Sequence, residues 1–327
     1  MIRNDALIVD FSKEADAENI AVDILGDAGV VQLRNIFDPE TVDYVARRSQ
    51  EVFSNPSLGG SFGYYQKAYG KRFYDPLLLG GPTVDLLVNN IVTSLVEKYI
   101  NGGIFLAETF LKYDEEILGE LNLGIHADFS VGYKDGENPA LTENELKNPL
   151  GVGGVIYLHD TSKGSFCFSL GSHKYGAPFG GLLDKRYSDD FVASILDSMI
   201  ILPGKKGDII LFDDRGFHGP EIQTESARLS LLIDYFKREE FSYRTRTPMP
   251  ALLNDLGQLN EKQLRILGLG SNFSIPYEEY HIRTFRDTKG YKIVQKAFTW
   301  QFAYQYRKYL LKKSIKKLLL LHKAQKQ

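Results

Sequence analysis

Cysteine is nearly absent from the chain: Cys167 is the one cysteine among 327 residues. A single cysteine excludes an intrachain disulfide scaffold and fits a reducing cytosol. Long apolar runs are missing as well, and because no stretch of about 20 apolar residues occurs, no membrane-spanning helix is predicted. Polar and acidic residues interrupt each apolar run of residues 1–20, so a secretory signal is not expected. These absences favour a soluble cytosolic protein.

Acidic residues are missing from the C-terminal segment. Residues 291–327 contain ten Lys or Arg and no Asp or Glu, so the rest of the chain has 29 basic and 42 acidic residues. The formal net charge of −3 thus hides an acidic body, with a net charge of −13, and a basic tail. Such a division of charge is typical of a protein with a surface that binds a partner.

Helical patterns dominate the first hundred residues. Residues 12–35 predict a helix, a glycine-containing turn and a strand at Val30–Leu33. A second helix is predicted to follow Asp38 as its N-cap, with Pro39 at its first position. A further helix is predicted from about Thr83 to Tyr99.

The pattern changes after residues 101–103, where short apolar or alternating runs are separated by turn-rich pieces. These runs are IFLAETFLKY, LNLGIHADFSVGY, VGGVIYLHD, SFCFSL, GDIILFD and ARLSLLIDYFK. Several short strands separated by turns predict a mainly β fold with flanking helices, whose core is an antiparallel barrel or a double-stranded β-helix (jelly roll, cupin-like).

The predicted organisation is one domain in three parts. Residues 1–103 form a helical and strand support, and residues 104–240 form the jelly-roll catalytic core. Residues 241–327 form a helical extension that ends in a basic amphipathic tail at about 300–327.

Two histidines and an aspartate have a spacing that fits a metal site. The segment LGIHADFS places His126 and Asp128 two positions apart in a stretch suited to a strand, so both side chains project from one face. Two surface polar residues are the alternative interpretation of this pair alone. His218, from a distant strand, can supply a third ligand. Two imidazoles and one carboxylate on one face of an octahedron bind Fe(II) and leave three positions open.

Arg228 and Ser230 follow His218 and share one face of the predicted strand ARLSLLIDYFK. A guanidinium pairs with a carboxylate through two hydrogen bonds, and a neighbouring hydroxyl can add a third. The distal carboxylate of 2-oxoglutarate would suit these two residues. An ordinary strand arginine in a surface ion pair is the alternative.

Four segments are informative when they are taken together and in order: IHAD, YLHDTSKGSFCFSLGSHKYG, GDIILFDDRGFHG and RLSLLIDY. They resemble the phytanoyl-CoA dioxygenase family of Fe(II)- and 2-oxoglutarate-dependent oxygenases. The likeness covers about residues 104–237 and extends weakly to the helix-strand-helix pattern before it. It implies His126, Asp128 and His218 as iron ligands, with Arg228 and Ser230 as the anchor of 2-oxoglutarate.

The resemblance also implies a reaction. Fe(II), 2-oxoglutarate and O2 would act together to give succinate, CO2 and a hydroxylated substrate. Halogenating relatives have a small residue where Asp128 stands, so the carboxylate favours hydroxylation. Ile125 and Leu170 replace the Trp and Pro that many members have, and both can alter the substrate pocket. A catalytically silent jelly-roll protein that binds a ligand in the same cavity is the rival interpretation.

Two further segments have a possible role at the site. The resemblance implies a substrate-contacting or supporting role for Ser172, His173 and Lys174 in the segment LGSHKYG, and plain loop packing is the alternative. The polar segment 133–149, which follows the first ligand strand, has the length and position of a lid.

The tail predicts an amphipathic helix. At about 100° per residue, the leucines of residues 310–321 gather on one half of the helix and the lysines on the other, apart from Leu320. Trp300 and several tyrosines lie just upstream, and such aromatic residues suit a membrane interface. We expect the tail to lie on an anionic membrane surface. Packing on the core, an oligomer contact and a nucleic-acid patch are alternatives, and the leucines argue against the last.

A tail on the membrane implies a lipid-linked substrate. Among similar oxygenases, the bacterial hydroxylases of the Kdo sugar of lipopolysaccharide resemble this chain in size and in their basic, leucine-rich C-terminal helix. The resemblance implies Kdo-lipid A as substrate and the cytoplasmic face of the inner membrane as location. A soluble small metabolite is the alternative substrate, and the tail would then pack or dimerise.

Overall fold

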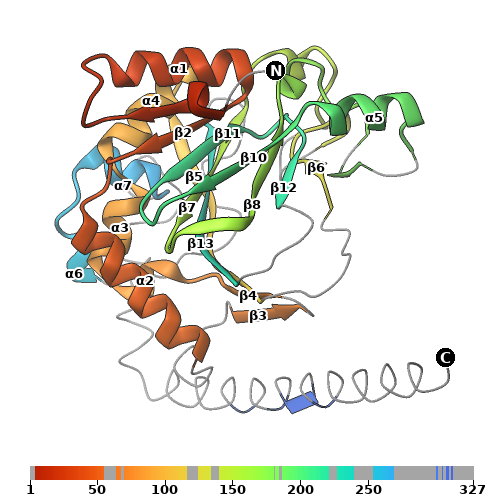
Figure 1. Cartoon of the computed structure of the whole chain (residues 1–327). Coiled ribbons are helices and arrows are strands. Elements are labelled where there is room, and N and C mark those ends of the chain that lie inside the picture. Colours follow the sequence, from red (N-terminus) through yellow and green to blue (C-terminus); the bar gives the residue numbers. More distant parts are fainter. Residues whose placement is uncertain are drawn as a thin grey trace.

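The chain is seen in a computed structural model, in which two β-sheets face each other and helices cover the outer side of the larger sheet (Figure 1). The residues it describes are 4–54, 64–67, 70–115, 124–133, 140–179, 181–183, 186–220, 227–238 and 253–268, with Trp300, Tyr304, Arg307, Lys308 and Leu311 of the tail. The predicted jelly-roll core with flanking helices is confirmed.

The larger sheet has eight strands and is antiparallel except for its first pair. In spatial order the strands are β1 (Ile8–Asp10), β2 (Val30–Arg34), β11 (Ile209–Asp213), β7 (Gly151–Tyr157), β13 (Arg228–Lys237), β5 (Ile104–Asp114), β4 (Gly70–Phe73) and β3 (Tyr64–Lys67). The long pair β5–β13 forms the part of this sheet that faces the site.

The smaller sheet has five strands, most of them short. In spatial order they are β10 (Met199–Gly204), β8 (Thr161–Ser169), β12 (His218–Pro220), β6 (His126–Ala127) and β9 (Gly181–Leu182). The predicted strand in residues 121–133 is therefore limited to His126 and Ala127 among the residues described, and His218 begins the short strand β12.

The helices follow the predicted caps, with one correction. The α-helices are α1 (Ala17–Ala28), α2 (Pro39–Ser54), α3 (Gly81–Leu87), α4 (Asn90–Ile100), α5 (Asp189–Asp197), α6 (Leu253–Leu256) and α7 (Glu261–Ile266). Asp38 accepts a hydrogen bond from the Thr41 N–H at 2.9 Å, as an N-cap does. The single helix predicted from Thr83 to Tyr99 is wrong: Asn89 accepts from two backbone N–H groups and starts a second helix.

Buried apolar side chains form four clusters in the described part of the chain, and two of these hold the layers together. The outer core lies between the large sheet and α1 to α4, and includes Leu25, Leu33 and Leu95. The inner core lies between the two sheets and includes Tyr157 and Phe168. Each core buries apolar surface that its elements expose on one face, which is the main stabilising term of the fold.

Glycines of β7 make room in the interior between the sheets. A Cβ added to Gly153 would lie 2.2 Å from the Phe212 ring, and one added to Gly151 would lie 2.5 Å from an oxygen of the buried Asp214 carboxyl. A larger residue at either position would displace these side chains, so close packing requires glycine here.

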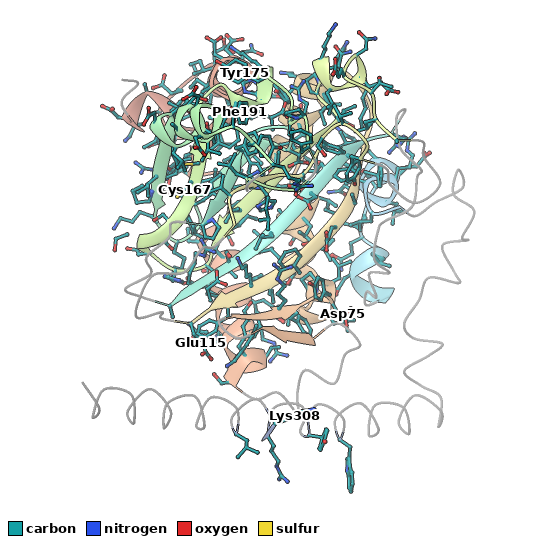
Figure 2. All side chains as sticks on the ribbon, turned by 90° about the vertical axis from the view of Figure 1, so that its right-hand side faces the viewer. Asp75, Glu115, Cys167, Tyr175, Phe191 and Lys308 are labelled. Carbon is teal, nitrogen blue, oxygen red and sulfur yellow. The ribbon has the colours of Figure 1, made fainter. Side chains whose placement is uncertain are left out.

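Labelled residues mark the two ends of the molecule. Tyr175 and Phe191 lie at one end, and Glu115, directly after β5, lies at the other (Figure 2). Of the segment 133–149 proposed as a lid, residues 134–139 lie outside the described part, and Leu146 is buried against the body. Among the helices that the structure describes, none has the length and hydropathy to cross a membrane.

Candidate metal centre and its cavity

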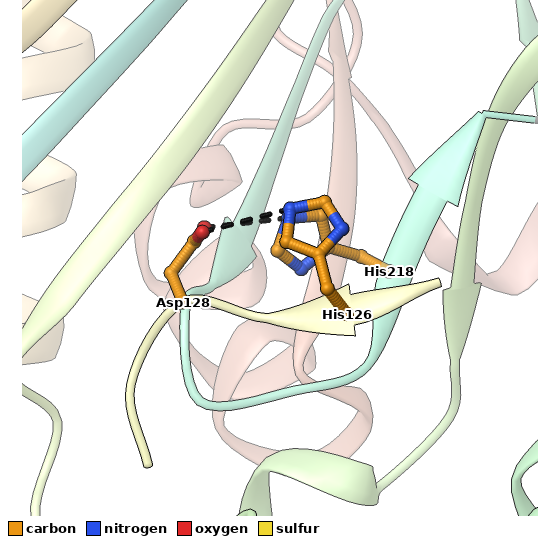
Figure 3. Close-up of side chains that lie close together, drawn as sticks. All are labelled: His126, Asp128 and His218. Atoms are coloured by element: carbon orange, nitrogen blue, oxygen red, sulfur yellow. Dashed lines mark ion pairs between the residues drawn. The ribbon is translucent and has the colours of Figure 1, made fainter. Parts of the chain in front are cut away.

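His126 and His218 face each other across two neighbouring strands. They are register partners in the β6–β12 pair, and their ring centroids lie 4.5 Å apart. Asp128 lies just beyond β6, where its N–H donates to the Asp214 carbonyl at 2.9 Å. Its carboxylate oxygens lie 3.6 Å from His126 Nε2 and 3.4 Å from His218 Nε2 (Figure 3). The three residues therefore converge, although a turn rather than a regular strand directs Asp128.

Backbone carbonyls fix the orientation of both imidazoles. Nδ1 of His126 lies 2.8 Å from the Gly124 carbonyl, and Nδ1 of His218 lies 3.0 Å from the Gly216 carbonyl. Because a carbonyl can only accept, each Nδ1 carries the proton and each Nε2 offers its lone pair toward Asp128. The ligand atoms of the three residues all lie within 4.8 Å of one another. Two imidazole nitrogens and one carboxylate oxygen in this arrangement fit Fe(II) bound on one face of an octahedron.

Burial keeps His126 in the form that binds a metal. Burial, and next the neighbouring His218, lower the pKa of the His126 imidazole from its ordinary 6.5, while Asp128 acts in the opposite direction. A lowered pKa leaves this imidazole neutral at neutral pH, and only the neutral ring can donate a lone pair.

His126, Asp128 and His218 line a cavity of about 210 Å³ between the two sheets. One wall is formed by alternate residues of β5 and β13, which are paired in four rows: Arg228 with Asp114, Lys112 with Ser230, Phe110 with Leu232, and Glu108 with Asp234; of these residues, Asp114 alone does not line the cavity. The rows change from charged through apolar to acidic, so the cavity has a cationic end and an acidic end.

The cationic end contains Lys112, Arg228 and Arg72. Arg228 donates from Nε to Asp114 at 3.1 Å, from Nη2 to the same oxygen, and from Nη1 to the Gly164 carbonyl at 2.8 Å. Burial lowers the pKa of Lys112 to about 8, against the opposing effect of Asp114. A ligand carboxylate would meet a positive potential here.

The acidic end contains Glu108 and Asp234, next to the metal ligands. Burial, and next the charge of Asp128, raise the pKa of Asp234 well above its ordinary value. The shift favours the protonated form of Asp234, and in that form the carboxyl can donate a hydrogen bond.

The loop residues with an implied substrate role do not line this cavity. Ser172 Oγ donates to the Ser169 carbonyl at 2.7 Å and accepts from the Phe217 N–H at 2.9 Å, so it supports the segment that leads to His218. His173 is buried, with Nε2 3.1 Å from the Gly26 carbonyl. Lys174 forms an ion pair with Asp27 on the surface.

Glu108, Lys112 and Asp234 also line the cavity, although they were not predicted from the sequence. A signal was present in β5, where Glu108, Lys112 and Asp114 stand at even spacing in an otherwise apolar strand. Polar residues at even spacing lie on one face of a strand, and a polar face toward the interior of a jelly roll indicates a cavity.

Protein-family models give no match to the chain, and curated protein sequences give none either. Solved structures do match. EctD from S. alaskensis with 2-oxoglutarate and 5-hydroxyectoine has a TM-score of 0.56 at 14% identity, covering 69% of this chain and 79% of that one. The epimerase SnoN in complex with Fe3+, alpha ketoglutarate and nogalamycin RO has a TM-score of 0.52 at 16% identity, covering 68% and 85%.

A third structure is HygX from Streptomyces hygroscopicus with nickel, 2-oxoglutarate and hygromycin B, with a TM-score of 0.50 at 19% identity, covering 68% of this chain and 88% of that one. At these identities the likeness shows the fold alone, a jelly roll that this chain shares with the three structures. The phytanoyl-CoA dioxygenase family in particular stays a resemblance.

Proposed function

We propose that this chain is an Fe(II)- and 2-oxoglutarate-dependent dioxygenase that hydroxylates an unactivated C–H bond. The observation that carries the proposal is the cluster of His126, Asp128 and His218, with both Nε2 lone pairs directed toward Asp128 at the wall of a cavity. Solved structures of the same fold that contain 2-oxoglutarate with iron or nickel support it. When bound, iron, 2-oxoglutarate and O2 supply the oxidising chemistry.

The residues of the chain bind and orient the reactants. His126, Asp128 and His218 would hold Fe(II) and leave its other positions toward the cavity. The cationic end would bind the distal carboxylate of 2-oxoglutarate, and the apolar row of Phe110 and Leu232 would lie along its carbon chain. The acidic end stays open to the substrate.

Anaerobic addition of Fe(II) and then 2-oxoglutarate to the purified protein should produce a visible metal-to-ligand charge-transfer band. The band requires the metal and the oxo acid in one site, so His126→Ala, which removes a ligand, should lose it. His159→Gln is the matched control, because His159 lies outside the cavity lining and Gln keeps an acceptor for the Leu229 N–H. Tight iron binding by the unsubstituted protein without a band would instead favour the silent binding protein.

The substrate that we propose is a membrane-linked glycolipid, with the Kdo sugar of Kdo-lipid A as the first candidate. Support comes from the likeness to Kdo hydroxylases in size and tail. The acidic end of the cavity adds support, because the carboxyl groups of Asp234 and Glu108 line it and can form hydrogen bonds with sugar hydroxyls.

The proposal also places the enzyme at the cytoplasmic face of the inner membrane through its tail. Trp300, Tyr304 and Leu311 are helical and expose 82%, 67% and 62% of their surface. Their spacing of four and seven residues puts them on one side of a helix, and the neighbouring Arg307 and Lys308 are exposed too. Exposed aromatic and basic residues together suit an anionic membrane interface. The rest of the tail lies outside the described residues.

The protein should sediment with anionic liposomes at low salt and be released at high salt. Each basic residue near an anionic surface contributes about 1 kcal/mol, and salt screens that attraction. Trp300→Ala with Leu311→Ala should weaken sedimentation, whereas Ile20→Ala, an exposed apolar residue of α1, should not. Absence of binding at low salt would remove the membrane argument and favour a soluble metabolite as substrate.

A further inference from the structure

Arg228 is already bound by a carboxylate of the chain itself. Asp114 is its register partner, and one Asp114 oxygen accepts from both Nε and Nη2 of the guanidinium, while Gly164 accepts from Nη1. Arg228 is 4% exposed. A carboxylate ligand that took this edge of the guanidinium would have to displace Asp114 and leave its charge unpaired in the interior, which is strongly unfavourable.

Lys112 and Ser230, in the next row, retain capacity for a ligand. The ammonium of Lys112 has three N–H donors, and Asp114, at 3.3 Å, is the acceptor seen for it in the described part of the chain. Ser230 is 1% exposed, and its Oγ has no hydrogen-bond partner among the residues described. Both side chains line the cavity.

A buried hydroxyl without a partner is uncommon in a folded protein and indicates that the group has a role in binding or function. Here the hydroxyl lies opposite the largely buried ammonium of Lys112, and Arg72, the register partner of Lys112 on β4, adds a further positive charge to the cavity wall. One hydroxyl and one ammonium facing the same space match the two oxygens of a carboxylate.

We propose that Lys112, together with Ser230, binds the distal carboxylate of 2-oxoglutarate. Arg228 is a positioning residue: it holds Asp114, and Asp114 in turn holds the ammonium of Lys112. This assignment differs from the one that the family resemblance implies, in which Arg228 binds the carboxylate directly. It rests on the proposed function, because it names the residue that selects the cosubstrate of that same site.

The test compares two oxo acids by anaerobic titration of the charge-transfer band. 2-Oxopentanoate has the chain length of 2-oxoglutarate but a methyl group in place of the distal carboxylate. In Lys112→Met the dissociation constant of 2-oxoglutarate should rise by about 30-fold or more, the range expected for loss of one partner of a buried ion pair. The dissociation constant of 2-oxopentanoate should change by less than about threefold, because this acid has no distal carboxylate to pair with the ammonium.

Two variants complete the set. Ser230→Ala should raise the dissociation constant of 2-oxoglutarate by about fivefold, as expected for the loss of one hydrogen bond. The dissociation constant of 2-oxopentanoate should not change. Lys13→Met is the control, since Lys13 is an exposed lysine far along the chain from the cavity lining. Lys112→Met should fold, because Arg228 still pairs with Asp114, and an unchanged thermal unfolding curve checks this.

The pH dependence gives an independent readout. Arg72, Asp114, His126 and Arg228 are the charged or titratable groups that act on Lys112. Because the pKa of Lys112 is lowered to about 8 by burial, the ammonium loses its proton as the pH rises through this value. The preference for 2-oxoglutarate over 2-oxopentanoate should therefore fall above about pH 8 in the unsubstituted protein, and the Lys112→Met variant should show no such fall.

The outcomes separate the two proposals. A normal band in the unsubstituted protein, with 2-oxoglutarate bound equally well by Lys112→Met, would refute the role of Lys112 and leave the proposed function standing. Absence of a band with either oxo acid in the unsubstituted protein would refute both.

Discussion

Replacing His218 with alanine will reduce 2-oxoglutarate-dependent succinate formation by more than about 100-fold, the upper range for loss of a group that only supports a metal ligand. His218 is 5% exposed, and the Gly216 carbonyl fixes its Nδ1, so its Nε2 is held in place as a ligand that alanine does not supply. Two ligands would remain, on a short strand and a turn, and they hold iron too weakly to keep it in the site.

Succinate should be measured together with bound iron. The expected result is a parallel loss of both, because His218 acts on the reaction through the metal. His159→Gln should retain both, since His159 contributes its Nε2 to the Leu229 N–H and lies outside the cavity lining. Undiminished turnover in His218→Ala would show that the three residues are not the iron site.

The three candidate metal ligands could be singled out in the sequence because their pattern is local. His126 and Asp128 are two positions apart, so in an extended segment their side chains project from the same face. The structure nevertheless limits β6 to two residues and directs Asp128 by a hydrogen bond from its own N–H to Asp214. That bond joins segments far apart in the chain, so no local pattern indicates it.

The cationic end of the cavity could not be predicted in the same way, because it depends on register. Lys112 lies opposite Ser230 and Asp114 lies opposite Arg228 only in the observed pairing of β5 with β13. A shift of one residue would turn each of these side chains to the other face of the sheet. The sequence indicated Arg228 as an anchor but not the carboxylate that already occupies it.

The fold class could be predicted from the succession of short strands and turns in the sequence. Several individual strands and helix ends could not be predicted. The strands β3, β6, β9 and β12 have two to four residues each, too few for a period to be recognised. The break between α3 and α4 depends on one capping side chain, Asn89, inside a stretch whose apolar period suits a single helix. Tertiary pairing and single caps decide such elements, and neither shows in a local pattern.

A buried charge cluster near the candidate metal site is expected to make a large contribution to stability. Asp213 is fully buried and binds Arg215 through two hydrogen bonds, at 2.8 and 2.6 Å, while Arg215 is 4% exposed. Tyr99 of α4 donates to the same carboxylate at 2.5 Å. Burial, and next Asp213, raise the pKa of Tyr99, so its hydroxyl keeps the proton that it donates. The cluster joins α4 to the segment that leads into His218.

Asp213→Ala should lower the free energy of unfolding by about 3–5 kcal/mol, the range for loss of one partner of a buried ion pair. Asp197→Ala, at an exposed carboxylate that ends α5, should change it by less than about 0.5 kcal/mol. Urea unfolding measures both. Asp213→Ala combined with Arg215→Met should cost less than Asp213→Ala alone, because the cost of the single change is the unpaired guanidinium rather than the lost attraction. A double variant no more stable than the single one would show that Asp213 acts instead through its hydrogen bonds to Tyr99 and the backbone.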